Sequence, residues 1–302
     1  MHFAAYRALE LATFTSAALA ACPKLSTPLK VSQLIDGTSA GGKAACVRSK
    51  ISVSASANNT KLLFKSPSSQ QELTQMTVDM ATVGSDYLTR IFGGPNKVSG
   101  TFQIYAELCV PKLVDNIETL LFLNHGGTLD HSYWDFAPGY SFVDAAVEAG
   151  YATFNYDRLG YGLSDHPDPN QVVQRALHVE IAHVLLQGLR VSSVGGKSIK
   201  KIVGVGHSAG SALILGVVGK YPLDFDGLVF SGISGSIEGV ASSQISFNLI
   251  PAALDPSGRF KDLDKGYLTQ GSVAQDFQFS FYHYPEFDPK SKFNTFSTTW
   301  VI

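Results

Sequence analysis

A serine between two glycines constrains this chain more than any other stretch. Residues 202–206 are apolar, β-branched or glycine, Gly206-His207-Ser208-Ala209-Gly210 follows, and small apolar residues continue to Lys220. This order predicts a strand, a tight turn at Ser208 and a helix. The turn would expose the serine hydroxyl above the sheet edge, and the two glycines would let strand and helix pass closely. We therefore interpret Ser208 as a nucleophile, and the alternative is an ordinary glycine-rich turn.

Two backbone amides are candidates for binding a negatively charged oxygen beside this serine. The amide of Ala209 opens the predicted helix and points into the same space as the serine. A second glycine pair lies in Asn124-His125-Gly126-Gly127-Thr128, directly after the apolar run 119–123. We expect the Gly127 amide to complete an oxyanion hole and Gly126 to shape its turn, against the alternative of a plain glycine turn.

The centre of the chain alternates between strand and helix signals. Apolar runs at 119–123 and 151–156 predict strands that are buried in the sheet, and further strands are expected over 200–206 and 226–231. Between them, a helix is expected over 141–148, and another should follow an Asn170 cap. The second helix carries an apolar stripe spaced by four, namely Val173, Leu177, Ile181, Leu185 and Leu189. This alternation predicts an α/β fold with a mostly parallel sheet and helices on both faces.

The N-terminal third is less regular. Residues 23–45 are rich in Ser, Thr, Gly, Pro and Lys and are typical of a loop or a loosely attached extension. Alternating residues predict strands over 47–55 and 98–110, and a helix is expected over about 72–92.

A third motif links the first two. Asp157-Arg158-Leu159-Gly160-Tyr161-Gly162-Leu163-Ser164-Asp165 follows the strand after His125-Gly126-Gly127 and precedes the serine motif. With these motifs in this order, residues 98–232 resemble the α/β-hydrolase family. The N-terminal extension, together with Cys109 at the end of an early strand, more weakly resembles secreted fungal members. Asp157 and Arg158 are expected to brace their loop rather than to act in catalysis.

The resemblance implies hydrolysis of an ester-like or amide bond of a small molecule, without a cofactor or a bound metal. Ser208 would attack the carbonyl, a histidine would take its proton, and a carboxylate would orient that histidine. Serine at the turn argues against the epoxide-hydrolase and dehalogenase branches, which carry aspartate there. The alternative is a catalytically incomplete protein or fragment that acts as a binding module.

The remaining triad members are harder to place. The family order puts an acid and then a histidine on later strands, but no such strands are recognisable after Ser231. One histidine, His283, lies downstream of Ser208 and is the candidate base. Candidate acids in turn-like settings are Asp255, Asp262, Asp264, Asp276 and Asp288. We therefore expect a C-terminally truncated hydrolase in which His283 is at best a substitute base.

These patterns divide the chain into four parts. Residues 1–20 resemble a secretory signal peptide with Arg7 at its start and an Ala18-Leu19-Ala20 cleavage site, although Glu10 fits it poorly. An N-terminal extension covers 21–97, the hydrolase core 98–232, and a mainly helical cap 233–302. Aromatic residues in the cap would either wall an apolar substrate pocket or form the cap's own core.

Composition excludes several other classes of protein. The formal net charge is −2 and no basic run occurs, which gives no support for nucleic-acid binding or polybasic membrane attachment. No apolar stretch is long enough to insert stably in a membrane. Three cysteines lack metal-site spacing, and in a secreted chain two of them could pair. The expected partner is a small-molecule substrate, and the oligomeric state stays open.

Overall fold

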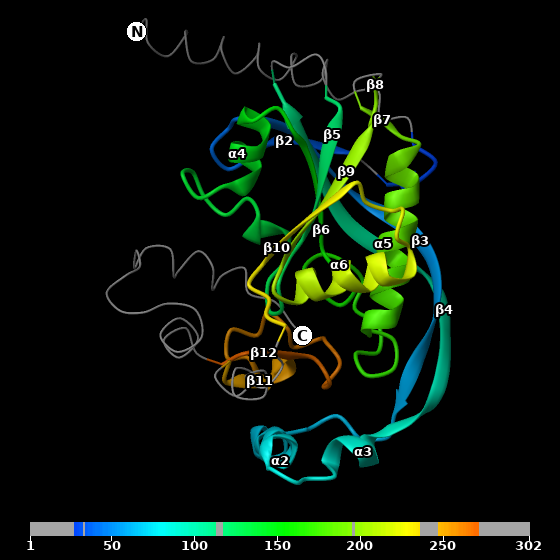
Figure 1. The fold of residues 1–302 in the computed structure, drawn as a ribbon. Coiled ribbons are helices and arrows are strands. Elements are labelled where there is room, and N and C mark those ends of the chain that lie inside the picture. The colour runs from blue at the N-terminus through cyan, green and yellow to red at the C-terminus, as the bar shows by residue number, and fades with distance from the viewer. Residues whose placement is uncertain (1–26, 33, 113–116, 195–196, 236–246, 272–302) are drawn as a thin grey trace, which may run out of the picture.

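A computed structural model of the chain describes residues 27–32, 34–112, 117–194, 197–235 and 247–271 (Figure 1). Within them, an eight-stranded sheet has the order β1-β3-β4-β6-β5-β9-β10, with β2 paired to β3. The bounds are β1 Lys30–Val31, β2 Ile35–Thr38, β3 Ala44–Leu62, β4 Phe92–Pro111, β5 Thr119–Asn124, β6 Ala152–Tyr156, β9 Lys201–His207 and β10 Gly227–Ser231. A short antiparallel pair, β7 (Ser193–Val194) and β8 (Lys197–Ser198), stands apart from this sheet.

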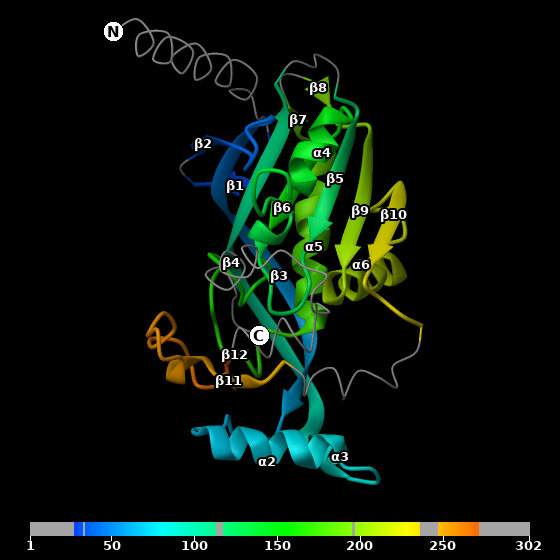
Figure 2. The same cartoon turned by 90° about the vertical axis from the view of Figure 1, so that its left-hand side faces the viewer.

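The four strands expected over 119–231 form the parallel half of the sheet, as predicted. β6, β5, β9 and β10 run parallel to one another, and β4 joins β6 in the antiparallel sense. Their carboxyl ends lie at one edge of the sheet, where the serine motif and the glycine pair both follow a strand (Figure 2). The predicted α/β fold class is therefore confirmed.

Helices cover both faces of the sheet. α4 (Phe142–Glu148) lies on one face, and α5 (Arg175–Arg190) and α6 (Ala209–Lys220) lie on the other (Figure 1). Ser141 caps α4 by accepting the amide of Asp144, and the helix ends before Gly150, which has a φ of 88°. The helix predicted over 141–148 is thus confirmed.

The start of α5 differs from the prediction. Gln174 occupies the N-cap position, while the Asn170 side chain donates to the Ser66 hydroxyl 2.6 Å away and is not available as a cap. The predicted stripe is correct from the second member onward, because Leu177, Ile181, Leu185 and Leu189 are all buried.

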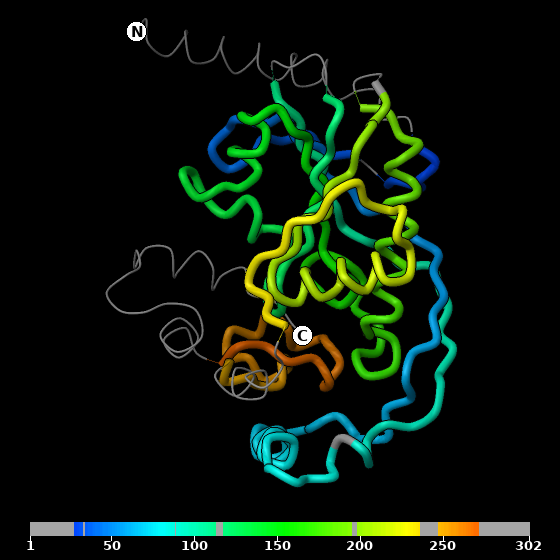
Figure 3. Tube along the Cα trace, in the orientation of Figure 1, coloured from blue at the N-terminus to red at the C-terminus, as the bar shows by residue number. Residues whose placement is uncertain are grey.

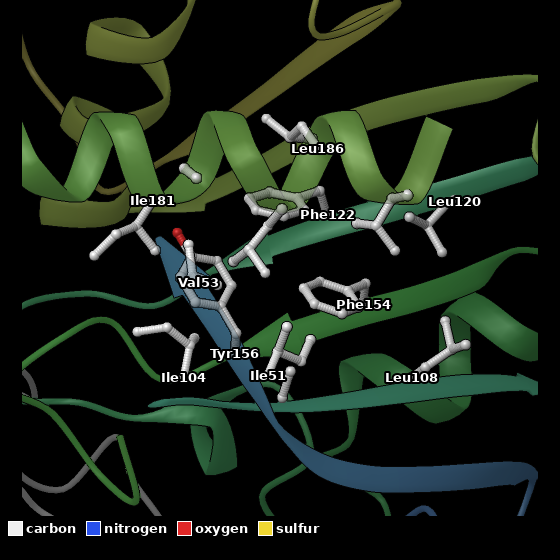
Figure 4. Close-up of a cluster of buried hydrophobic side chains, with 14 of the residues drawn as sticks. Ile51, Val53, Ile104, Leu108, Leu120, Phe122, Phe154, Tyr156, Ile181 and Leu186 are labelled. Atoms are coloured by element: carbon white, nitrogen blue, oxygen red, sulfur yellow. The ribbon is translucent and has the colours of Figure 1, made fainter. Parts of the chain in front are cut away.

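Most of the core lies between α5 and the sheet. Ile181 and Leu186 pack over Phe122 and Phe154 from the central strands (Figure 4), and the two aromatic rings stack 5.6 Å apart. A second apolar cluster on the opposite face joins α4 to the same strands. Because both faces are covered, the central strands require the continuous apolar runs seen in the sequence.

The N-terminal extension contributes to the main sheet. β3 and β4 are 19 and 20 residues long and run side by side well past the other strands (Figure 3). The expected division at residues 97 and 98 therefore lies inside β4. Within 23–45, expected to be loop, β1 and β2 pair with β3.

Two helices occupy the far end of this hairpin. α2 (Gln70–Ala81) and α3 (Tyr87–Ile91) replace the single helix expected over 72–92. The interruption contains Gly84 at a φ of 78°, a conformation that ends a helix readily. α2 begins at Ser69, whose side chain accepts the amide of Glu72.

A disulfide joins the two long strands. Cys46 and Cys109 face each other directly in the β3–β4 register and are bonded. The third cysteine, Cys22, lies outside the described residues, as does the predicted signal peptide.

The described part of the expected cap is not helical. Residues 247–271 contain an antiparallel pair, β11 (Leu249–Pro251) and β12 (Leu268–Gln270), with a short 3₁₀ turn, η2 (Ala252–Leu254), between them. Pro251, Pro256 and Gly258, the last with a φ of 70°, disfavour a continuous helix here. This pair lies between α2 and the rest of the molecule (Figures 1 and 2).

In the described ranges, no helix combines the length and the apolar character that crossing a membrane would require.

Candidate active site

Ser208 lies in a strained turn between β9 and α6. Its φ of 52° and ψ of −118° fall in a region that non-glycine residues rarely adopt. The Ser208 amide donates to the Ser231 carbonyl at 2.8 Å, which ties the turn to the end of β10. The residue is exposed, and its hydroxyl makes no hydrogen bond with any described residue. A serine hydroxyl is therefore held above the carboxyl edge of the sheet.

The two motif glycines are required by close backbone packing. A Cβ on Gly206 would lie 2.6 Å from the Ser211 backbone, and one on Gly210 would lie 2.1 Å from the Asn124 carbonyl oxygen. No side chain fits at either position without moving the backbone. The close passage predicted from the sequence is thus present.

The glycine pair after β5 lies beside the serine. A Cβ added to Gly126 would be 3.5 Å from the Cβ of Ser208, and one added to Gly127 would be 3.9 Å from the Cβ of Ala209. Among the described residues, the amides of Gly127 and Ala209 donate no hydrogen bond. The structure therefore brings together Ser208 and both predicted oxyanion donors, and both amides are free to bind an acceptor.

Arg158 holds the glycine loop from the opposite side. Its Nη1 donates to the Asn124 side chain at 2.9 Å and to the His125 carbonyl, and its Nη2 donates to the Gly126 carbonyl at 2.8 Å. A trans peptide directs its C=O and the following N–H in opposite directions. Fixing the Gly126 carbonyl on Arg158 therefore turns the Gly127 N–H away from Arg158 and leaves it unpaired.

His125 is a structural histidine. It is fully buried, and its Nε2 accepts the Arg158 amide at 3.2 Å, so the proton of the neutral ring resides on Nδ1 and is shared with the Gly126 carbonyl. Burial and the nearby Arg158 charge hold the pKa of His125 well below its usual value. Its two ring nitrogens are occupied within the loop, so it is not positioned to take a proton from Ser208.

Asp157 organises a buried polar cluster behind the site. Its carboxylate accepts the His131 amide at 2.7 Å, the His131 ring at 2.8 Å and the Leu163 amide at 2.8 Å. The bracing role expected for Asp157 agrees with these bonds. Burial opposes protonation of His131, but the hydrogen bond and charge of Asp157 outweigh it and raise the pKa of His131 to about 9.

The same cluster has the geometry of a metal site but is satisfied without one. Ligand atoms of Asp130, His131 and Asp157 lie within 4.8 Å of one another. Asp130 accepts the amide and hydroxyl of Ser132 at 2.8 and 2.6 Å, and the other two residues bond each other. These carboxylates are thus used in holding the loops that flank the serine.

The other predicted residues fall at different places. His283, Asp276 and Asp288 lie outside the described residues, and no described histidine bonds the Ser208 hydroxyl. Asp255 bonds Ser257 and Arg259, and Asp264 bonds the Gly266 amide.

Two nearby features escaped the sequence analysis. His207 stacks on Tyr133 with ring centroids 4.7 Å apart and shares a hydrogen bond with Ser231. Leu73, Met76 and Met80 of α2 line a cavity that extends to Ala209. Their helical spacing was a usable signal, but the polar residues between them obscured it.

A sequence model of the alpha/beta hydrolase family matches residues 120–297, which is more than half of the chain. The chain belongs to the alpha/beta hydrolase family. Both glycine motifs and the Asp157–Asp165 segment of this family member lie inside the matched region. No curated protein sequence matches it.

Solved structures with partial similarity include two epoxide hydrolases and an esterase. The epoxide hydrolase from Vigna radiata is 16% identical, with 43% of this chain and 34% of that chain covered and a TM-score of 0.34. The esterase from Exiguobacterium antarcticum is 17% identical, with 43% and 41% covered and a TM-score of 0.34. An epoxide hydrolase from an endophytic Streptomyces is 21% identical, with 42% and 33% covered and a TM-score of 0.33. The matched part of this family member spans less than half the length of each of these proteins.

Proposed function

We propose that this chain is a serine hydrolase that cleaves an ester bond of a small molecule. The observation that carries the proposal is the position of Ser208 in a strained turn, next to the unpaired amides of Gly127 and Ala209. A nucleophile beside two preorganised donors is the arrangement that acyl transfer requires. Amide bonds are cleaved by the same chemistry and are the second substrate class.

The proposed reaction has two steps. The Ser208 Oγ adds to the substrate carbonyl carbon, and the carbonyl oxygen, now negative, accepts hydrogen bonds from Gly127 and Ala209. The alcohol leaves with the proton that a base removed from Oγ, and the acyl group stays on the serine. Water then hydrolyses the acyl-serine and returns the proton to Oγ. The one candidate base that the sequence offers is His283, at best a substitute for the family histidine, and it lies outside the described residues.

Labelling with a fluorophosphonate probe tests the nucleophile directly. We expect peptide mass spectrometry to place the label on Ser208, and Ser208→Ala to lose both labelling and p-nitrophenyl acetate hydrolysis with an unchanged circular dichroism spectrum. Ser211→Ala is the matched control, because its hydroxyl donates to the Ser231 carbonyl instead of facing solvent. Label on another residue, or undiminished turnover in Ser208→Ala, would refute the assignment.

A second candidate is a hydrolase-fold binding module without activity. It is favoured by the sequence after Ser231, in which the strands that carry the acid and the histidine in this family are not recognisable. Absence of labelling and of turnover in the folded wild-type protein between pH 5 and 9 would support this candidate over the first.

We also propose that the chain is exported and processed near Ala21. The Cys46–Cys109 disulfide supports this, because such bonds persist mainly in oxidising compartments. Mass spectrometry of protein from its native host should find the mature start there, and cytosolic protein that retains Met1 would contradict the proposal.

A further inference from the structure

A cavity of about 480 Å³ lies between the start of α6 and the far end of the N-terminal hairpin. Ala209, Ala212 and Leu213 of α6 line one side, and Leu73, Met76 and Met80 of α2 line another. Cavities of this size hold small organic ligands. Because Ala209 directly follows Ser208, the cavity begins next to the proposed nucleophile.

The polar side chains around the cavity are mostly engaged elsewhere. Arg158 bonds the glycine loop, and the Asn170 amide donates to Ser66. Burial and the Arg158 charge lower the pKa of His178 to about 3, so the neutral ring donates through Nε2 to the Leu159 carbonyl at 2.9 Å. Arg175 is exposed to solvent. The cavity therefore offers a ligand mainly hydrocarbon surface.

The wall formed by α2 is adaptable in its side chains but fixed in its backbone. Met76 and Met80 are the two methionines after Met1, and their unbranched thioethers adjust to ligands of different shape. The N-terminal end of the wall is anchored twice: Gln70 donates to the Leu249 carbonyl at 3.1 Å, and Asn170 donates to Ser66, just before the helix. Its distance from Ser208 is therefore set by the fold.

We propose that this cavity binds the apolar chain of the substrate, and that α2 is its outer wall and determines the chain length accepted. The proposal rests on the proposed serine hydrolase function. It makes the substrate an ester with a medium-length, uncharged hydrocarbon group. It also assigns selectivity to an N-terminal hairpin far from the serine in sequence.

Filling the cavity should change substrate preference without removing activity. In Met76→Trp, kcat/KM for p-nitrophenyl octanoate should fall at least tenfold, while that for p-nitrophenyl acetate stays within twofold of wild type. Each buried methylene contributes about 0.8 kcal/mol to binding. Excluding two methylenes of the octanoyl chain from the cavity therefore already lowers kcat/KM more than tenfold. The matched control is Val83→Trp, which adds the same bulk at a 99% exposed position beyond α2 and should leave the ratio unchanged.

A binding measurement separates this proposal from the proposed chemistry. In Ser208→Ala, an uncharged dansyl octylamide should bind with enhanced fluorescence, and octanamide should displace it where acetamide does not. Adding Met76→Trp should weaken this binding at least tenfold, and adding Val83→Trp should not. Should Met76→Trp fail to fold, Met80→Trp fills the same space from a more tolerant position that is 44% exposed.

The outcomes distinguish the two failures. Probe binding that is sensitive to position 76, without any ester turnover, would sink the hydrolase function but leave the apolar cavity in place. Ester turnover with an unchanged octanoate-to-acetate ratio in the folded position-76 and position-80 variants would overturn the cavity proposal alone. Failure of the probe to bind folded Ser208→Ala would overturn it as well.

Discussion

The serine turn requires a residue without a Cβ at position 210. Because a Cβ there would lie 2.1 Å from the Asn124 carbonyl oxygen, Gly210→Ala must displace backbone. We expect a loss in unfolding free energy of about 1–3 kcal/mol or more, together with loss of activity. Gly219→Ala, in the same helix and open to solvent, should instead stabilise by about 0.5–1 kcal/mol. Urea denaturation measures both, and equal effects would contradict the packing argument.

At Arg158, one guanidinium fixes two consecutive carbonyls of the glycine loop. Lysine can bond one of them but lacks the planar fork. We expect Arg158→Lys to lower kcat about 10–100-fold with little change in KM, because a misaligned oxyanion donor weakens binding of the transition state rather than the substrate. The rate of fluorophosphonate labelling should fall in parallel. Arg90→Lys, at an exposed ion pair, is the control. An effect on KM alone would disprove the positioning role.

The His131–Asp157 pair predicts a decline of stability at alkaline pH. The folded-state pKa of His131 is about 9 against an ordinary 6.5, so the folded chain retains a proton that the unfolded chain releases. The stability this adds is complete below pH 6.5 and is lost as the pH rises through 9.

Melting curves between pH 6 and 10 measure this decline as a fall in Tm of a few degrees, at about 2–4 °C per kcal/mol. His131→Gln should flatten the curve. His166→Gln should not, because burial lowers the pKa of His166 below its usual value, whereas the stability from His131 is lost above that value. A wild-type Tm that is constant over this range would refute the prediction.

Among the helices and strands, those that are buried on both faces were the easiest to predict from the sequence. Strands β5, β6 and β9 could be predicted because both of their faces are covered, which leaves a continuous apolar run. The oxyanion loop could be predicted because its glycines follow one of these strands directly. The full lengths of β3 and β4 could not, because their outer halves are partly exposed and carry mixed side chains. The role of α2 depends on where that hairpin folds back, which no local pattern encodes.

Two glutamine side chains continue the sheet where β3 runs past its neighbours. Gln174 bonds both the amide and the carbonyl of Thr60, at 2.9 and 2.8 Å, and Gln171 bonds those of Leu62 at 3.3 and 3.0 Å. Gln174→Ala should therefore speed hydrogen exchange at the Thr60 amide about fivefold, since one hydrogen bond is worth about 1 kcal/mol. Mass-spectrometric exchange should show no change at Val53, which stays paired with β4. Unchanged exchange at Thr60 would show that the Gln174 side chain does not protect this amide.

For the whole molecule, the Cys46–Cys109 bond is a constraint on the unfolded chain. It closes a loop across a sequence separation of 63 residues. Loop-closure entropy predicts that replacing both cysteines with alanine lowers the unfolding free energy by about 2–4 kcal/mol. Guanidinium denaturation with and without reductant checks this. Reductant should destabilise the wild type but leave the double variant unaffected, and equal stability of the two proteins would contradict the prediction.

The disulfide also makes residues 46–109 a covalent ring, and the wall of the cavity sits at the point of the ring farthest from the bond. A protease that cuts the exposed turn at Val83 and Gly84 cannot release either piece. The product is a molecule of two chains. The disulfide and the pairing of β3 with β4 hold the chains together, and the cut lies between α2 and α3. Cleavage there would free α2 from α3 and turn a fixed wall into a hinged one, so limited proteolysis would widen the range of chains admitted to the serine without dismantling the protein.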